Sequence, residues 1–299
     1  MVAHVPFIQR LGLEREPLPS HVWTIALTGD GPPAPGRSGC ARARHGATRA
    51  PAAVDGGRLE RVSRLARAGQ TIAVLTRDNA AAWAADLAAA PQARAIVQPS
   101  DRGPAAELLL PMLKIARRDP AATVVVLPAD QRMLEDEAGF VRCIARAVWA
   151  VALRPELPIL IAAHPDRTVR DGWIALGPPI DGLEYLALYT VEHFVDGASL
   201  AEQQHLLDAG ALVSTSIMVA RAGTLRALAA RTLPDVLETL EPLEEAFDRP
   251  EESLLIEAVY ESMPRTSLAP LERARDVAVL ALPDVAWQRI PDRPLALAS

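Results

Sequence analysis

A short apolar run from Ala121 to Leu127 constrains the fold of this chain more than any other segment. It follows the turn pair Asp119-Pro120 and contains three consecutive valines at positions 124–126. A continuous run of β-branched residues of this length is typical of a strand that is buried on both faces, as the strands of parallel sheets are. The run therefore predicts a central strand of a parallel sheet.

The segments around this strand alternate between strand-like and helix-like patterns. Further strands are expected at residues 23–28, 71–76, 93–97 and 158–163, and helices at 58–68, 80–90, 105–117 and 138–153. This alternation implies βαβ units, so we expect an α/β fold with a mixed, mainly parallel sheet and helices on both faces. After residue 163 the pattern predicts antiparallel strands at 173–176 and 183–194, strands at 212–220 and 277–282, helices at 200–209 and 224–232, and a solvated, acidic helical stretch at 236–262.

The composition argues against several classes of protein. Half of the residues are hydrophobic, which is ample for a large core. The net charge of −6 gives no overall attraction to nucleic acid or to anionic membranes, and no segment approaches the roughly 20 apolar residues of a membrane span. Two cysteines, Cys40 and Cys143, are too few for a disulfide framework, and residues 1–16 lack a signal-peptide pattern. We therefore expect a cytoplasmic protein that binds neither nucleic acid nor membrane, and the sequence leaves homo- or hetero-oligomers open.

Asp130 stands just past the carboxyl end of the expected central strand. Ligands of open α/β sheets bind along that edge, and a carboxylate there can hold Mg²⁺ that is shared with substrate phosphates. An Asp at this position is also a favoured N-cap for a following helix. Position alone does not choose between the two roles.

Five stretches, taken in order, are similar to the motifs of one enzyme family. They are residues 98–105 (Gln-Pro-Ser-Asp-Arg-Gly-Pro-Ala), 125–131 (Val-Val-Leu-Pro-Ala-Asp-Gln), 171–174 (Asp-Gly-Trp-Ile), 191–199, and 210–215 (Gly-Ala-Leu-Val-Ser-Thr). The family's segments read Pro-x-Asn-Arg-Gly/Asn-Thr-Ala, Leu-Pro-Ala-Asp-His, Tyr-Gly-Tyr/Trp-Ile, Phe-Val-Glu-Lys-Pro and Gly-x-x-Trp-Asn-Ser/Thr. By these motifs the chain resembles the bacterial sugar-1-phosphate nucleotidylyltransferases, nearest to the mannose-1-phosphate guanylyltransferase type.

The resemblance implies a Rossmann-like fold of the nucleotide-diphospho-sugar transferase kind. An N-terminal arm at 1–20 would precede a single domain at 21–299, with a nucleotide half at about 21–163 and a sugar half at about 164–290. In the family reaction a sugar 1-phosphate, here of the mannose type, attacks the α-phosphorus of a nucleotide such as GTP. A nucleotide sugar and pyrophosphate are formed with the help of Mg²⁺ and precise positioning. The matching positions are Arg49 and Asp130 as catalytic residues, Asp130 as metal ligand, and Gly29, Asp30, Gly31, Gly103, Gly172, Asp196 and Ser214 as substrate contacts.

The chain departs from the family at its charged positions. The stretch from Gly29 to Ala34 contains two prolines in place of a Gly-rich loop that ends in Arg, and prolines lack the N–H donors that cradle phosphates. Arg49 replaces one lysine, Gly197 replaces the other, and Arg289 falls where a second metal-binding Asp is expected. Lys114 is the only lysine of the chain. Loss of several charged contacts removes most of a rate enhancement, so we expect weak transfer or none.

Three functions stay open at this point. The chain could be a working transferase in which loop arginines, namely Arg37, Arg42, Arg44 and Arg49, form a new phosphate clamp. It could be an inactive homologue that binds a nucleotide, a nucleotide sugar or a protein partner. It could also be a relic without a ligand, in which those arginines form an ordinary basic loop. The fold alone does not decide between these functions.

Overall fold

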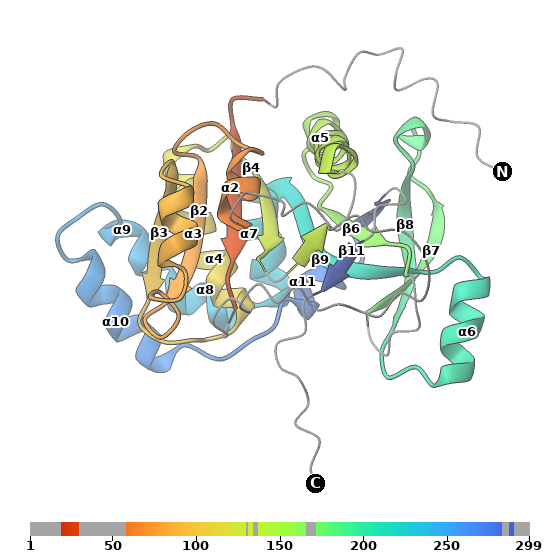
Figure 1. Ribbon diagram of the computed structural model, residues 1–299. Coiled ribbons are helices and arrows are strands. Elements are labelled where there is room, and N and C mark those ends of the chain that lie inside the picture. The colour runs from red at the N-terminus through yellow and green to blue at the C-terminus, as the bar shows by residue number, and fades with distance from the viewer. Residues whose placement is uncertain are drawn as a thin grey trace, which may run out of the picture.

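The computed structural model describes residues 19–29, 58–129, 131–133, 137–165, 172–282 and 287–289 (Figure 1). Several predictions fall outside these ranges, and they keep the status of predictions. They concern the N-terminal arm, the arginine-containing loop, and the site residues Asp30, Gly31, Arg49 and Asp130.

A nine-stranded mixed sheet forms the centre of the described structure, in the order β3-β2-β1-β4-β9-β6-β10-β8-β7. The strands are β1 (Val22–Leu27), β2 (Thr71–Thr76), β3 (Ala93–Gln98), β4 (Thr123–Pro128), β6 (Ile159–Ala163), β7 (Trp173–Pro179), β8 (Leu188–Val195), β9 (Leu212–Arg221) and β10 (Ala278–Ala281). Within this sheet β8 and β9 run antiparallel to their neighbours, and the other strands share one direction. The prediction of a mixed sheet is confirmed. Parallel pairing is limited to β3-β2-β1-β4 and to β6-β10, and the other pairs of this sheet are antiparallel.

Helices cover both faces of the sheet (Figure 1). One face carries α4 (Pro104–Arg118), α7 (Ala222–Thr232) and α8 (Pro234–Leu240), and the other carries α2 (Arg58–Ser63) and α5 (Glu137–Leu153). The remaining helices are α3 (Ala84–Ala89), α6 (Leu200–Asp208), α9 (Leu243–Ala246), α10 (Glu252–Ser262), α11 (Ala269–Glu272) and the 3₁₀ turn Glu184–Leu186. Among the helices described, none combines the length and the apolar character that crossing a membrane requires.

The valine run forms β4, which lies between β1 and β9 as a central strand. Its residues from Thr123 to Leu127 are all buried. Successive side chains of a strand point to opposite faces. Val124 and Val126 therefore pack into the cluster beneath α4, and Val125 and Leu127 pack beneath α5. Burial on both faces explains why this strand has no polar alternation in its sequence.

The part of the sheet from β9 to β7 is closed on itself. The expectation of a Rossmann-like fold, which has an open sheet, needs correction for this part. Besides its pairing with β8, β7 pairs with the first residues of β9, where Trp173 lies opposite Val213. This pairing closes a ring of β9, β6, β10, β8 and β7. The long strand β9 pairs with β4 near its end and with β7 near its start. It bends between these pairings, because its register with β6 shifts between Ile161 and Ala162 and because Ser216 adopts a positive φ of 57°.

Several predicted elements are shorter than expected, for local reasons. The helix expected at 80–90 begins only at Ala84, because the Asn79 side chain binds the backbone of Thr76 and holds residues 77–83 in turns. The helix expected at 58–68 ends at Ser63. The strand expected at 183–194 begins at Leu188, after the 3₁₀ turn.

The acidic stretch at 236–262 is not one solvated helix. It divides into α8, α9 and α10, with Pro242 and Pro250 at the breaks, where proline cannot continue the helical hydrogen bonds. Two carboxylates of this stretch form ion pairs with residues of α7 and α4. Glu244 pairs with Arg226 at 2.7 Å, and Glu252 pairs with the Nζ of Lys114 at 2.7 Å.

Candidate functional site

The ends of β1 and β2 are joined by a buried asparagine that fixes the start of the predicted phosphate loop. Asn79 is 2% exposed and donates from Nδ2 to Thr28 Oγ1 at 3.0 Å and to the Gly29 carbonyl at 2.7 Å. Its Oδ1 accepts the N–H of Thr76 at 2.8 Å. Gly29 has a φ of +66° with open space around its Cα, so the chain leaves β1 in a conformation that suits glycine. Gly29 follows the carboxyl end of β1, and its role in binding stays a prediction.

Gly103 lies at the N-cap of α4, where backbone conformation and packing together account for glycine. A Cβ at this position would meet the carbonyl oxygen of Thr266 at 2.6 Å, and φ is +81°. The Gly103 N–H already binds Asp101 Oδ1 at 2.7 Å. The backbone of Thr266 also bonds to Arg102 and to Ala105 on either side. The loop after β3 is therefore held against the segment that follows α10, and the substrate contact expected of Gly103 stays untested.

Two predicted site residues of the sugar half meet where β7 begins and β8 ends. Asp196 accepts the Gly172 N–H at 2.8 Å through Oδ1, and its Oδ2 binds the guanidinium of Arg273. The Arg273 Cζ also lies 5.7 Å from the centre of the Phe194 ring, within the range of a cation–π contact. The Gly172 hydrogen bond, followed by that of Arg273, lowers the pKa of Asp196 from its ordinary value. We call Gly172, Phe194, Asp196 and Arg273 the Asp196 corner.

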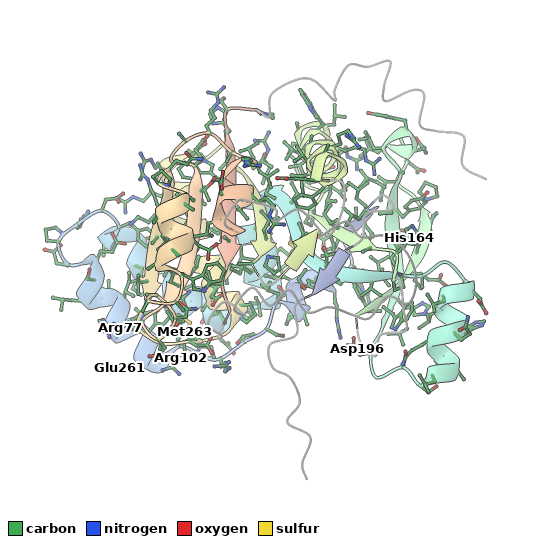
Figure 2. The ribbon with its side chains drawn as sticks, in the orientation of Figure 1. Arg77, Arg102, His164, Asp196, Glu261 and Met263 are labelled. Carbon is green, nitrogen blue, oxygen red and sulfur yellow. The ribbon has the colours of Figure 1, made fainter. Side chains whose placement is uncertain are left out.

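Ser214 extends this group of polar residues. Its Oγ donates to Glu272 Oε2 at 3.0 Å, and Glu272 is the chain neighbour of Arg273. The short helix α11 thus ends with the carboxylate of Glu272, and the next residue along the chain carries the guanidinium of Arg273. Figure 2 shows Asp196 at the lower edge of the view, the same edge as Arg102 at the other end of the sheet.

The described residues do not fit a Mg²⁺ site. Within the described ranges no three His, Cys, Asp or Glu side chains gather as metal ligands. Asp130 lies outside these ranges, but its neighbour Gln131 begins β5 (Gln131–Met133), which pairs with β11 (Trp287–Arg289). In that register the backbone of Arg289 is paired with that of Gln131. The described ranges therefore offer no donor set for a divalent metal, and the role of Asp130 stays a prediction.

Lys114 is placed on α4, away from these polar groups. Its Nζ binds Glu252 at 2.7 Å, lies 3.5 Å from Asp248 Oδ1, and stacks over the Phe247 ring at 5.6 Å. The side chain is 28% exposed. The one lysine of the chain therefore ties α4 to α10 and to the segment before it.

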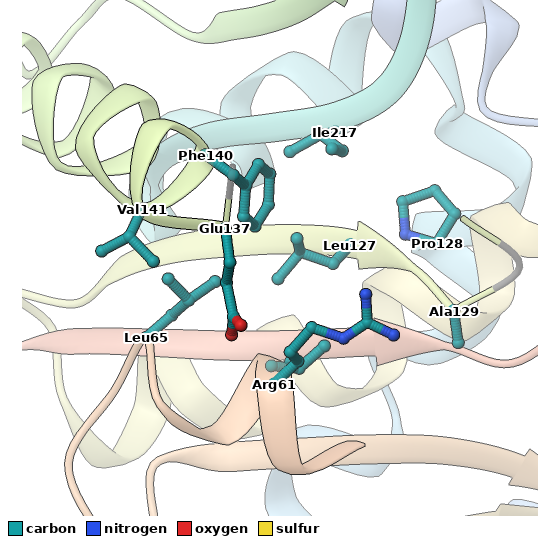
Figure 3. Close-up of a pocket in the computed structure, with 10 residues that line it drawn as sticks. Arg61, Leu65, Leu127, Pro128, Ala129, Glu137, Phe140, Val141 and Ile217 are labelled. Atoms are coloured by element: carbon teal, nitrogen blue, oxygen red, sulfur yellow. The ribbon is translucent and has the colours of Figure 1, made fainter. Parts of the chain in front are cut away.

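A cavity lies at the carboxyl end of β4, between α2 and α5 (Figure 3). Its volume is about 50 Å³, and most of its wall is apolar, with Arg61 and Glu137 as charged residues. The ten residues that line it are Arg61, Val62, Leu65, Leu127, Pro128, Ala129, Glu137, Phe140, Val141 and Ile217. Of the predicted site residues that the structure describes, none lines this cavity, although it reaches Ala129, which precedes Asp130 in the sequence. The substrate contacts expected of Gly29 and Asp196 stay predictions.

The similarity of this chain to known proteins lies in its fold. No protein-family model matches the chain, and no curated protein matches it in sequence. A solved structure described as mannose-1-phosphate geranyltransferase from Thermus thermophilus has a TM-score of 0.70 at 22% identity, covering 90% of this chain and 76% of that one. One described as mannose-6-phosphate isomerase from Helicobacter pylori has a TM-score of 0.67 at 14% identity, covering 90% of this chain and 99% of that one. The chain has the fold of these two proteins.

Sequence reasoning missed four residues that organise these polar groups. Asn79 had a local signal, since Thr76 and Asn79 are three residues apart and bond reciprocally, side chain to backbone. Phe194 lay inside a recognised motif, but nothing there indicated an arginine against its ring. Glu272 and Arg273 follow a stretch without a clear pattern, and only the tertiary fold brings them to Asp196 and Ser214.

Proposed function

We propose that this chain binds a nucleotide sugar, or the nucleotide and sugar phosphate from which one is made, along the edge of the sheet that carries Gly29 and Asp196. The observation that carries the proposal is the Asp196 corner. It combines carboxylate acceptors, an aromatic ring and a guanidinium, which are groups that suit a phosphorylated sugar. The fold, shared with two proteins whose names both refer to mannose phosphates, supports this choice of ligand.

We further infer that nucleotidyl transfer by this chain is slow or absent. The reaction needs cations around the phosphate groups as charge builds up on them. Two features argue that side-chain cations are missing: Lys114 is engaged by Glu252, and Gly197 carries no charge. A third argues against a bound metal ion, because the sequence has Arg289 where the resemblance calls for a second metal-binding aspartate. Binding can outlast catalysis, because shape and backbone groups still hold a ligand whose transition state is no longer stabilised.

Calorimetric titration with GTP, mannose 1-phosphate and GDP-mannose, with and without Mg²⁺, tests the binding. Steady-state pyrophosphate release from GTP and mannose 1-phosphate tests the transfer. We expect saturable binding of GDP-mannose and no detectable pyrophosphate. Turnover in the usual enzyme range of about 1–1000 per second, abolished by Asp130→Ala, would mean that the chain is a working transferase. No binding of any of the three ligands would refute the proposed function.

A further inference from the structure

The sugar half lacks a cation in its own motif but acquires one from elsewhere in the chain. Gly197 follows Asp196 where the resemblance calls for a lysine beside the sugar phosphate. Arg273, 77 residues later in the sequence, reaches the same aspartate. The structure therefore supplies positive charge within one residue of the position where the sequence loses it.

The contacts of Arg273 hold it without using up its donors. One nitrogen, Nη2, binds Asp196 Oδ2, and the guanidinium lies over the Phe194 ring. A guanidinium has five N–H donors, and among the described residues Arg273 donates to Asp196, so further donors can serve another acceptor. The side chain is 42% exposed, which leaves it accessible to a ligand from solvent. The aspartate and the ring restrict the rotamers of Arg273, and a restricted fork loses less entropy when it binds an anion.

The charges around Arg273 select the kind of ligand. Asp196 and Glu272 are carboxylates within the same group, so a bare anion would be repelled as well as attracted. A sugar phosphate meets both requirements, because its hydroxyls can donate to the carboxylates while its phosphate accepts from the guanidinium. Phe194 adds an apolar ring surface beside them.

We propose that Arg273 is the phosphate-binding cation of the sugar half and that its ligand is a phosphorylated sugar. This inference rests on the proposed function and assigns a residue to it. The Asp196–Arg273 pair then serves as a preformed half of the site: Asp196 holds the guanidinium in place, and the free donors of Arg273 face the phosphate when it arrives.

The test compares Arg273→Ala, Arg273→Lys and a matched control, Arg154→Ala. Arg154 is also paired with one carboxylate, that of Glu156 at 2.6 Å, and is 43% exposed, but it lies between α5 and β6 and is not part of the Asp196 corner. Urea unfolding checks that each variant is folded. Each is titrated by calorimetry with mannose 1-phosphate, with mannose and with GDP.

We expect Arg273→Ala to weaken mannose 1-phosphate binding about ten- to hundredfold, the usual effect of losing one charge-assisted hydrogen bond. Arg273→Lys should recover part of that loss, because it keeps the charge but not the fork. The affinity for mannose and for GDP, and all affinities of Arg154→Ala, should stay within about twofold of the parent.

Two results would overturn the inference, and they are distinguishable. If folded Arg273→Ala binds mannose 1-phosphate as tightly as the parent, Arg273 is only a structural partner of Asp196, and the proposed function stands. If the parent binds GDP but no mannose 1-phosphate, the assignment of a phosphorylated sugar to this corner is wrong while nucleotide binding stands. Binding of neither ligand, nor of GDP-mannose, would remove the proposed function together with this inference.

Discussion

Replacing Gly103 by alanine tests how tightly the loop after β3 is packed. With φ at +81° and ψ at 168°, this residue occupies a region of backbone space that is essentially reserved for glycine, at a cost of about 1–3 kcal/mol for other residues. The new Cβ would also lie 2.6 Å from the carbonyl oxygen of Thr266, a backbone atom that cannot rotate away. Overpacking of this kind costs about 1–3 kcal/mol more. We therefore expect Gly103→Ala to lower the free energy of unfolding by roughly 2–6 kcal/mol.

Two other glycines separate the contributions in the same urea-unfolding assay. Gly182 has a φ of +77° but nothing within 4 Å of an added Cβ, so Gly182→Ala should show the backbone cost alone. Gly223 lies within α7, has no positive φ and no close neighbour, so Gly223→Ala should raise stability by about 0.5–1 kcal/mol. The reasoning fails if Gly103→Ala is no more destabilising than Gly182→Ala, since the contact with Thr266 would then cost nothing.

Three further predictions concern single side chains. Asn79→Ala should lower the free energy of unfolding in urea by roughly 2–4 kcal/mol, because buried polar groups at the ends of β1 and β2 would lose their hydrogen-bond partner. A loss below about 1 kcal/mol would contradict that role. Burial raises the pKa of the Cys143 thiol to about 12, so iodoacetamide at about pH 8 should alkylate this thiol only after the protein unfolds. Peptide mass spectrometry measures the alkylation, and an alkylated Cys143 in the native protein would show that the thiol is not buried. The folded-state pKa of Asp196 lies below its ordinary value of 3.8, chiefly through the Gly172 N–H, so its stabilising effect is complete above that value and is lost as pH falls through the lowered pKa. The stability difference between the parent and Asp196→Asn should therefore shrink between about pH 5 and pH 2, and a difference that grows on acidification would reverse the sign of this argument.

The strands of the parallel half were predictable because their signal is local. The valine run and the apolar segment that became β2 are buried on both faces, so they read as strands without any knowledge of their partners. Helix boundaries were less accurate where a side chain competes for backbone groups, as Asn79 does before α3. The ring closed by Trp173 and Val213 had no local signal, because it depends on a bend within β9 that only the assembled sheet reveals.

The candidate site likewise contains residues that the sequence could identify and one that it could not. Gly172 and Asp196 were identified by their place in short motifs, and the hydrogen bond between them shows that the two segments meet. Arg273 was not identified, because its position is set by α11 and by the packing of a segment far along the chain. Comparison with a sequence motif shows that a charged residue is lost at Gly197. It cannot show that Arg273, from a distant segment, brings a positive charge to the same place in the fold.

The strand β9 determines how this protein can be divided and recombined. One end of β9 pairs with β7, and its other end pairs with β4, so a single strand is built into both halves of the molecule. A fragment that ended at residue 163 would leave the edge of β4 open, with its buried valines and unpaired backbone groups exposed, which is a template for aggregation. The halves are therefore not interchangeable modules. New specificity in such a chain has to be acquired through the loops at the carboxyl edge, which can change without breaking the shared strand.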